Sequence, residues 1–190
     1  MKSVLISIRP KWCELIASGK KTVEVRKTKP KLETPFKCYI YCTKDNSFAE
    51  KTLRGFDDNG KAIYYKANKG KVIGEFVCDC MTALKANNLI QAYYNNTKNT
   101  CLTDQEITRY ADGKKLYYWH ISDLVIYDEP RELGEFFHYC GDNPNCDGCE
   151  AHYYSNTECG KEDYCCSIIE GCNPLKRPFQ SWGYVYEADT

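Results

Sequence analysis

The feature that most constrains the fold of this 190-residue chain is a series of short stretches in which apolar and polar side chains alternate. In residues 36–43, for example, Phe36, Cys38 and Ile40 alternate with Lys37 and Tyr39. This period of two is typical of β-strands, whose successive side chains point to opposite faces of a sheet. We expect strands at residues 4–8, 22–27, 36–43, 62–65, 72–79, 116–127 and 181–187.

The helical stretches are fewer and shorter. Pro10 suits the first turn of a helix over residues 11–18, and Gly19 is a natural stop after it. A capping-box pattern over residues 103–106 predicts a second helix that continues to about residue 111. Strands without a repeated strand–helix alternation favour an α+β fold, a mixed β-barrel with short flanking helices. We expect residues 1–190 to form one domain, with a Cys-rich insertion at residues 134–178 between two barrel strands.

The formal net charge of zero hides an uneven distribution. Residues 1–71 contain 17 Lys and Arg against 7 Asp and Glu, whereas residues 128–190 contain 4 against 13. A basic first third can attract phosphate groups, although a Lys-rich surface that contacts only water gives the same count. No stretch approaches the ~20 apolar residues of a membrane span. We therefore expect a cytoplasmic protein without a membrane partner, in a compartment that keeps thiols reduced.

Seven of the 13 cysteines fall within residues 140–172. Under reducing conditions such a cluster favours metal ligation over disulfides, and Cys146-Asp147-Gly148-Cys149 has the C-x-x-C spacing of a zinc knuckle. We predict one structural zinc ion, because this acidic segment has few apolar side chains with which to fold by itself. The preferred ligands are Cys140, Cys146, Cys149 and Cys159, with Cys165, Cys166, Cys172 and His152 as alternates; unliganded thiols are the competing interpretation.

Three charged residues stand together after the first predicted helix. Glu24 and Arg26 are two positions apart on a predicted strand, so they project from one face, and Lys21 lies just before them. Two cations beside a carboxylate suit an anionic or polar ligand, since Arg grips phosphate with paired hydrogen bonds and Lys acts as a point charge. The alternative is a solvated ion pair on the sheet surface, worth about 0.2–1 kcal/mol.

The same residues carry a family resemblance. Residues 18–26, Ser-Gly-Lys-Lys-Thr-Val-Glu-Val-Arg, resemble the ASCH domain signature G-x-K-x-x-E-x-R, and residues 71–79, 117–133 and 178–187 extend the likeness more loosely, toward ASCH proteins of Gram-positive phages and prophages. The resemblance implies a PUA-like β-barrel whose cleft binds RNA, single-stranded nucleic acid or a nucleotide. It places the site at Lys21, Glu24 and Arg26.

Some members of the resembled family are hydrolases of RNA or of acylated cytidine, which keeps an enzyme in consideration. Lys21 matches the Lys of the amidohydrolase members, but Glu24 occupies their Thr position and their third group falls near Asn99 or Thr100. Glu24 would then act as a general base with Lys21 as an electrostatic helper. A third hypothesis is a phage-encoded factor that binds a host protein through the acidic segment.

Aromatic and polar residues near the motif extend the candidate site. Trp12 precedes it in sequence, and Gln180, Ser181 and Trp182 open the last predicted strand, where they could stack on a base or read its edge. Core or turn packing is the alternative for each of them. Tyr39, Tyr41 and Trp119 are weaker stacking candidates. Glu75 could pair with Lys21 or Arg26 or face solvent, and His120 is a lone histidine on a predicted strand.

Overall fold

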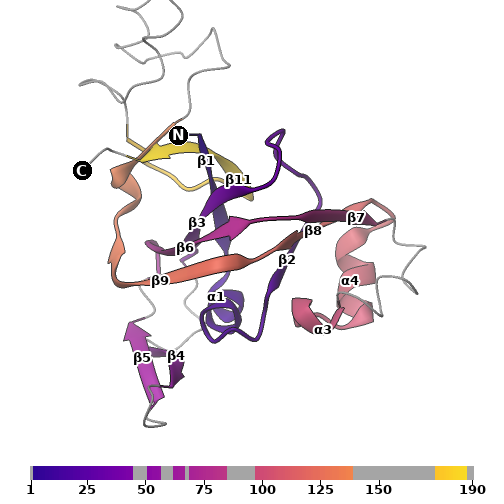
Figure 1. Ribbon diagram of the computed structural model, residues 1–190, viewed down its shortest axis with the longest axis horizontal. Helices are drawn as coiled ribbons and strands as arrows, with labels where there is room; N and C mark the ends of the chain where they lie inside the picture. Colours follow the sequence, from indigo (N-terminus) through magenta and orange to yellow (C-terminus); the bar gives the residue numbers. More distant parts are fainter. Residues whose placement is uncertain are drawn as a thin grey trace, which may run out of the picture.

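The fold is seen in a computed structural model that describes residues 2–44, 51–56, 62–66, 69–84, 97–138 and 174–187. The largest sheet has six strands (Figure 1). Their order is β10 (Phe136–His138), β11 (Trp182–Glu187), β1 (Ser3–Ile8), β3 (Phe36–Cys42), β6 (Val72–Cys78) and β9 (Ser122–Arg131). A second sheet has the order β2 (Val23–Arg26), β8 (Leu116–His120) and β7 (Met81–Leu84), and β4 (Lys51–Phe56) and β5 (Ala62–Lys66) form a separate hairpin.

The sequence of β1 is an unbroken run of apolar and small residues because the strand lies in the centre of the large sheet. It pairs with β11 on one side and β3 on the other, and all six of its side chains are buried. Ile6 and Ile8 join a core cluster with Ile16 of helix α1 (Pro10–Ala17), while Leu5 joins a second cluster with Phe136 and Val185. The large sheet is therefore buried on both faces along β1.

Helix α1 connects the large sheet to the strand that carries the charged motif. Pro10 occupies its first turn, as predicted, and Gly19 follows its end with φ of 70°, a backbone conformation that favours glycine. After α1 the chain leaves the large sheet, and β2 pairs with β8 of the small sheet. The chain returns to β3, which runs parallel to β1. Strand β2 is thereby an edge strand of the small sheet, joined in sequence to β1 and β3 of the large one.

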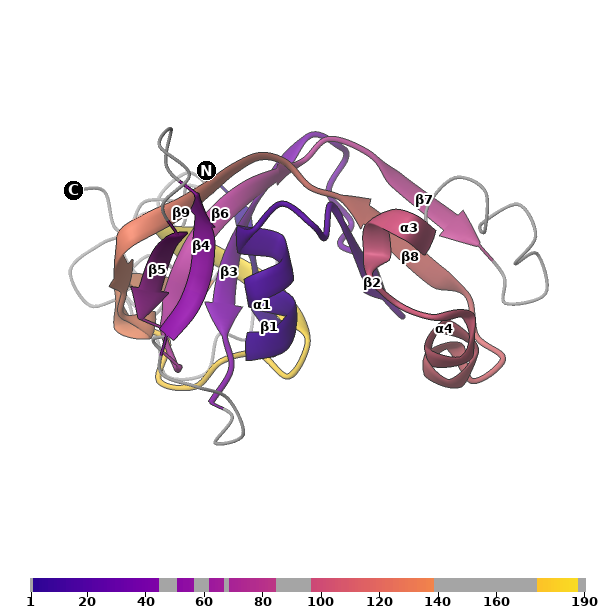
Figure 2. The same cartoon turned by 90° about the horizontal axis from the view of Figure 1, so that it is seen from below.

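Two bent strand pairs join the large sheet to the small one. Strands β6 and β7 are separated only by residues 79–80, and β8 and β9 only by residue 121. Strand β6 pairs with β9 in the large sheet, and β7 pairs with β8 in the small sheet, so both chains cross side by side (Figure 2). Gly74 lets β6 approach β9 closely, because an added Cβ there would lie 2.3 Å from the carbonyl oxygen of Val125.

The small sheet has its own apolar cluster. Helix α4 (Asp104–Ala111) packs Ile107 and Ala111 against Val23, Val25 and Tyr118 of the sheet. Its N-terminus carries the predicted capping box, in which the Thr103 hydroxyl accepts from the Glu106 backbone N–H and the Glu106 carboxylate accepts from the Thr103 backbone N–H. A one-turn helix, α3 (Thr97–Thr100), precedes it. Helix α4 is thus fixed opposite α1 (Figure 2).

The α+β class is confirmed, but the expected closed barrel is not found among the described strands. The six-stranded sheet ends at β9 and β10, which do not pair with each other, and the small sheet ends at β2 and β7. The single strand predicted at residues 116–127 is wrong, since it is two strands broken at Ile121, whose backbone N–H bonds to the carbonyl of Thr22. Strand β7 was not predicted. No helix in the described part of the chain is long and apolar enough to cross a bilayer.

The described cysteines divide into core residues and surface residues. Cys13, Cys38, Cys42 and Cys78 are buried in the first core cluster, where they act as small apolar side chains. Burial raises the pKa of Cys13 and Cys38 well above the ordinary value and that of Cys78 to about 12, so these thiols stay protonated. For these four, core packing replaces the metal role that the overall cysteine count had favoured.

The Cys-rich segment enters and leaves the fold at neighbouring points. Phe137 forms a β-bridge with Pro174, and the Leu175 backbone N–H donates to the carbonyl of Phe136 at 2.8 Å. The two predicted insertion boundaries, 134 and 178, lie close to these contacts. The predicted zinc ligands Cys140, Cys146, Cys149 and Cys159, and their alternates, lie outside the described residues. The zinc site therefore stays a prediction.

Candidate functional site

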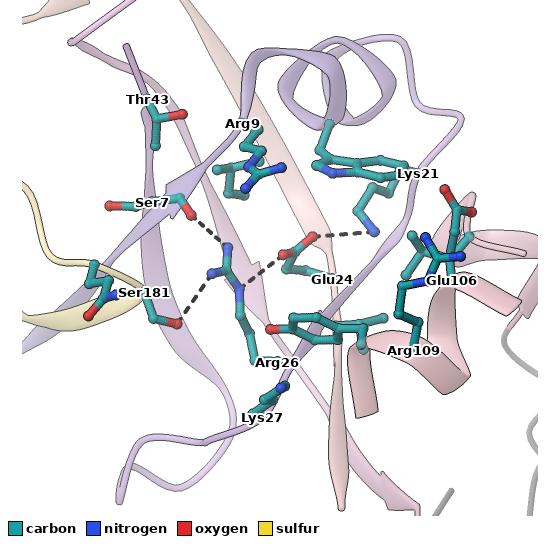
Figure 3. Close-up of a pocket in the computed structure, with 16 residues that line it drawn as sticks. Ser7, Arg9, Lys21, Glu24, Arg26, Lys27, Thr43, Glu106, Arg109 and Ser181 are labelled. Atoms are coloured by element: carbon teal, nitrogen blue, oxygen red, sulfur yellow. Dashed lines mark hydrogen bonds and ion pairs between the residues drawn. The ribbon is translucent and has the colours of Figure 1, made fainter. Parts of the chain in front are cut away.

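A pocket of about 810 Å³ lies where the two sheets meet, and it contains the charged motif (Figure 3). The end of β1, the start of α1, β2, the segment before β11 and the outer face of α4 all contribute walls. The volume falls within the roughly 300–1,000 Å³ range of small-molecule sites. Its lining consists of Ser7, Ile8, Arg9, Trp12, Lys21, Glu24, Val25, Arg26, Lys27, Thr43, Leu102, Glu106, Arg109, Tyr110, Gln180 and Ser181.

Arg26 ties the two sheets together at the floor of the pocket. Its Nη2 donates to the backbone carbonyl of Ser7 on β1 at 2.7 Å, and its Nη1 donates to the Ser181 hydroxyl at 3.3 Å. Its Nε lies 3.0 Å from Oε1 of Glu24 (Figure 3). The guanidinium is buried, and both Nη atoms donate hydrogen bonds, whereas Nε meets Glu24 as an ion pair without a well-aligned hydrogen bond. Arg26 consequently holds β2 against β1 of the large sheet.

Lys21 performs a similar role on the other side of Glu24. Its ammonium donates to the carbonyl of Val23 at 2.7 Å and to that of Thr100 at 2.8 Å, and it lies 3.3 Å from Oε2 of Glu24. The first two contacts are hydrogen bonds and the third is an ion pair, so three partners hold the ammonium group in place. Lys21 is only 2% exposed. It fixes α3 to β2 and cannot also grip a phosphate without losing one of these bonds.

The motif therefore forms a paired, buried triad. Both carboxylate oxygens of Glu24 are engaged, one by Lys21 and one by Arg26, and Glu24 is 7% exposed. Buried charges that are paired and hydrogen-bonded are retained, whereas leaving one of them alone is costly. The solvated surface pair that the sequence also allowed does not describe these buried side chains, and ligand binding by the triad stays a prediction.

The rim of the pocket carries a different set of charges. Arg9, Lys27 and Arg109 line the cavity and are exposed. Within the described residues, no hydrogen bond or ion pair occupies the charged group of any of the three. The complete lining holds five cations and two carboxylates, Glu24 and Glu106, and the carboxylate of Glu106 serves the capping box. The unpaired charge that a ligand meets is thus positive.

Two aromatic side chains stand among these cations. Trp12 is half-buried on α1, with the ammonium groups of Lys11 and Lys21 at 4.6 and 5.4 Å from its ring. Tyr110 on α4 is 39% exposed, and Lys27 lies 5.1 Å from its ring. Burial raises the pKa of Tyr110 from its ordinary value, so its hydroxyl remains a hydrogen-bond donor at neutral pH. Both rings line a positively charged cavity, and each has an ammonium group over its face.

The structure brings most of the predicted ligand residues into one place. Trp12, the motif triad, Gln180 and Ser181 all line the pocket. Trp182 does not: its ring packs 6.0 Å from that of Trp119 and its indole N–H donates to the Thr28 hydroxyl at 2.9 Å.

Several weaker candidates lie elsewhere. Tyr39 and Tyr41 are buried in the second core cluster, and Trp119 is fully buried in the first. Glu75 does not pair with the motif, because it lies 3.0 Å from the ammonium of Lys37 and accepts a hydrogen bond from Tyr127. Of the two positions weighed for a third catalytic group, Thr100 is buried with its carbonyl bound to Lys21. His120 lies outside the pocket, beside Asp79 and Cys80.

Sequence reasoning missed the contribution of helix α4. Glu106, Arg109 and Tyr110 stand at positions i, i+3 and i+4, so they share one helical face, and all three line the pocket. The spacing can be recognised in the sequence, but the sequence does not indicate which part of the fold this helical face borders. Arg9 and Lys27 were likewise missed, although Arg9 directly follows one predicted strand and Lys27 is the last residue of another.

Comparison with known proteins identifies a family and similar folds. The sequence model described as the ASCH domain matches residues 6–106. Two solved variants of ZmASCH from Zymomonas mobilis are similar in fold. A Tyr-to-Phe variant is 21% identical with a TM-score of 0.51, covering 70% of this chain and 77% of its own. A Ser-to-Ala variant is 23% identical with a TM-score of 0.50, covering 69% and 74%. No curated protein matches the chain.

Proposed function

Since the chain belongs to the ASCH domain family, we propose that it binds RNA or another single-stranded nucleic acid, or a nucleotide, in the pocket between its two sheets. The observation that carries this proposal is the rim of exposed, unpaired cations around Trp12 and Tyr110. Phosphate groups are attracted by such cations, and bases stack on aromatic rings with about 1–3 kcal/mol each. The zero net charge does not oppose this binding, because four of the five cations that line the pocket lie in the basic residues 1–71.

Each group in the pocket has a distinct part in this function. Arg9, Lys27 and Arg109 contact phosphates, and Trp12 and Tyr110 stack against bases or sugar faces. Gln180 is exposed at the edge and can exchange hydrogen bonds with a base. The triad of Lys21, Glu24 and Arg26 shapes the floor and presents a fixed carboxylate below the ligand.

A titration of fluorescently labelled single-stranded RNA tests the proposal directly. Arg109→Ala should weaken binding and reduce the dependence of log K on log salt by about 0.7, the value for one lost phosphate contact on a single strand. Lys114→Ala is the matched control, because Lys114 is exposed just beyond α4 but does not line the pocket. Equal affinities and salt slopes for the two variants would contradict the proposal. Competition with mononucleotides and single-stranded DNA distinguishes the ligand classes.

Hydrolysis of RNA or of acylated cytidine is the second candidate, favoured by the presence of Glu24 and Lys21 on the pocket floor. Because both Glu24 oxygens are held by cations, a general base there would have to release one ion pair first. Product analysis with both substrates tests this candidate. Turnover that is lost in Glu24→Gln, while RNA binding persists, supports an enzyme; an inactive wild-type chain that still binds RNA rejects it.

We also infer that one zinc ion is held by Cys140, Cys146, Cys149 and Cys159. The support is the density of thiols in residues 140–172, together with the meeting of the two ends of this segment at Phe137 and Pro174. An ion there would be structural, since four thiolates complete a tetrahedral site. Metal analysis of the reduced chain should find zinc that is lost when Cys146 and Cys149 are replaced by Ser. Unchanged zinc content in that variant would reject these ligands.

A further inference from the structure

A second group of metal-type donors lies where the two sheets join, outside the pocket. Asp79 and Cys80 form the bend between β6 and β7, and His120 ends β8 at the opposite bend. One donor atom from each, a carboxylate oxygen, a thiol sulfur and an imidazole nitrogen, lies within 4.8 Å of the other two. Figure 2 shows the paired strands of both bends crossing from the large sheet to the small one.

The backbone holds this group together without any ion. The His120 backbone N–H donates to the carbonyl of Cys80 at 3.1 Å, and the Ser122 hydroxyl donates to the carbonyl of Val77 at 3.0 Å. The backbone N–H of Ile121 donates to Thr22 on the adjacent segment at 2.9 Å. Both bends are thus positioned by the sheets, which leaves only side-chain rotation for a ligand to organise.

The side chains themselves are accessible. Nδ1 of His120 lies 2.7 Å from Oδ1 of Asp79, and their side chains are 42% and 44% exposed. Cys80 is exposed, in contrast to the four described cysteines that are buried in the core. Cysteine is among the most buried residue types, so a surface thiol beside a histidine and a carboxylate is unusual for packing alone. Nitrogen, sulfur and oxygen donors together suit a borderline cation such as Zn²⁺.

We propose that Asp79, Cys80 and His120 bind one Zn²⁺-type ion at the junction of the two sheets, with a fourth position open to water. Tetrahedral ligands at roughly 2.0–2.3 Å from zinc stand about 3.3 Å or more from each other. The carboxylate and imidazole must therefore separate slightly from their present contact, which exposed side chains can do. Cys78 is not a ligand, because its thiol is buried and donates to the carbonyl of Cys80.

An ion in this position would restrict the angle between the two sheets and would not contact a ligand in the pocket. None of its three ligands lines the pocket. It would cross-link the two bends through which the large sheet continues into the small one. The walls of the pocket come from both sheets, so the ion would restrict the angle between these walls. Its site differs in donor set and place from the thiolate site predicted in residues 140–172.

Metal titration of the full chain tests the proposal, with Co²⁺ as the spectroscopic probe and Zn²⁺ as the competitor, after chelator treatment and under reducing conditions. Wild type should bind one more Co²⁺ per chain than Cys80→Ser or His120→Asn, or bind that ion at least about 10-fold more tightly. Zn²⁺ should also raise the melting temperature of wild type more than that of either variant.

Cys101→Ser is the matched control, because Cys101 is a partly exposed thiol outside the group. It should bind metal as wild type does. The proposal is overturned if Cys80→Ser and His120→Asn retain wild-type stoichiometry and affinity. It is equally overturned if the only ion lost is the one removed by Cys146→Ser, since that ion belongs to the Cys-rich segment. Circular dichroism of both variants checks that they are folded.

Discussion

The floor and the rim of the pocket both contain cationic side chains, but those of the floor are buried and paired, whereas those of the rim are exposed. On the floor, Lys21 and Arg26 are buried, both form an ion pair with Glu24, and each donates two hydrogen bonds to carbonyl or hydroxyl groups. On the rim, Arg9, Lys27 and Arg109 are exposed and their charges are not paired within the described residues. The floor residues join β2 to β1 and α3, and the rim residues border the open part of the cavity.

This contrast separates the residues of the predicted family motif from the exposed residues that we propose contact the ligand. The G-x-K-x-x-E-x-R signature falls on the floor, where it fixes the junction of two sheets and one helix. The rim residues belong to no such pattern. A signature motif can therefore mark the architecture of a binding site while neighbouring residues provide the contacts. Substitutions on the floor should change stability, and substitutions on the rim should change binding.

The largest effect is expected for Lys21→Ala. The substitution removes two hydrogen bonds to buried carbonyls and leaves Glu24 paired on one side only. Breaking a buried ion pair costs about 3–5 kcal/mol, so the free energy of unfolding should fall by about that amount. Urea denaturation followed by circular dichroism measures it. Lys20→Ala is the matched control, since Lys20 is exposed one residue earlier and should change stability by less than about 0.5 kcal/mol.

A smaller effect is expected for Thr103→Ala at the start of α4. Its hydroxyl accepts from the Glu106 backbone N–H, and loss of such a cap costs about 1 kcal/mol. The same denaturation experiment should show this loss. Thr108→Ala, at an exposed position inside the helix, should be neutral or slightly stabilising because Ala has the higher helix propensity. A Thr103→Ala variant as stable as wild type would show that α4 is held by its apolar face alone.

The smallest effect concerns the pH dependence of the same cap. Hydrogen bonds from the Thr103 backbone N–H and hydroxyl hold the pKa of Glu106 below its ordinary value of 4.5. A carboxylate whose pKa is lower in the folded state than in the unfolded state stabilises the fold at pH values above the unfolded-state pKa. This stabilisation is lost as the pH falls through the folded-state pKa. The stability advantage of wild type over Glu106→Gln should therefore shrink between about pH 6 and about pH 3. An advantage that is constant over this interval would contradict the assignment.

Local patterns predicted the local parts of the fold. Alternation over residues 36–43 predicted β3, and the structure places Phe36, Cys38 and Ile40 in one core cluster and Tyr39 in the other. The capping-box sequence at Thr103 predicted the start of α4. In both cases the cause is contained within a few neighbouring residues, so the sequence alone suffices.

The features that the sequence did not predict depend on contacts between residues far apart in the chain. Lysine is ordinarily a surface residue, and the burial of Lys21 depends on the carbonyl of Thr100, 79 positions away in sequence. The break at Ile121 depends on Thr22, and nothing in the run of residues 116–127 interrupts its strand pattern. The role of Arg109 depends on where α4 packs against the small sheet. Each of these features is a property of the assembled fold rather than of a local pattern.

The most direct test of the division between floor and rim is the salt dependence of RNA binding by a variant in which Arg9, Lys27 and Arg109 are all replaced by Ala. If the three side chains each contact a phosphate, the slope of log K against log salt should decrease in magnitude by about 2, at about 0.7 for each contact. The free energy of unfolding should stay close to that of wild type, because all three residues are exposed. A triple variant with the wild-type slope and affinity would contradict the account.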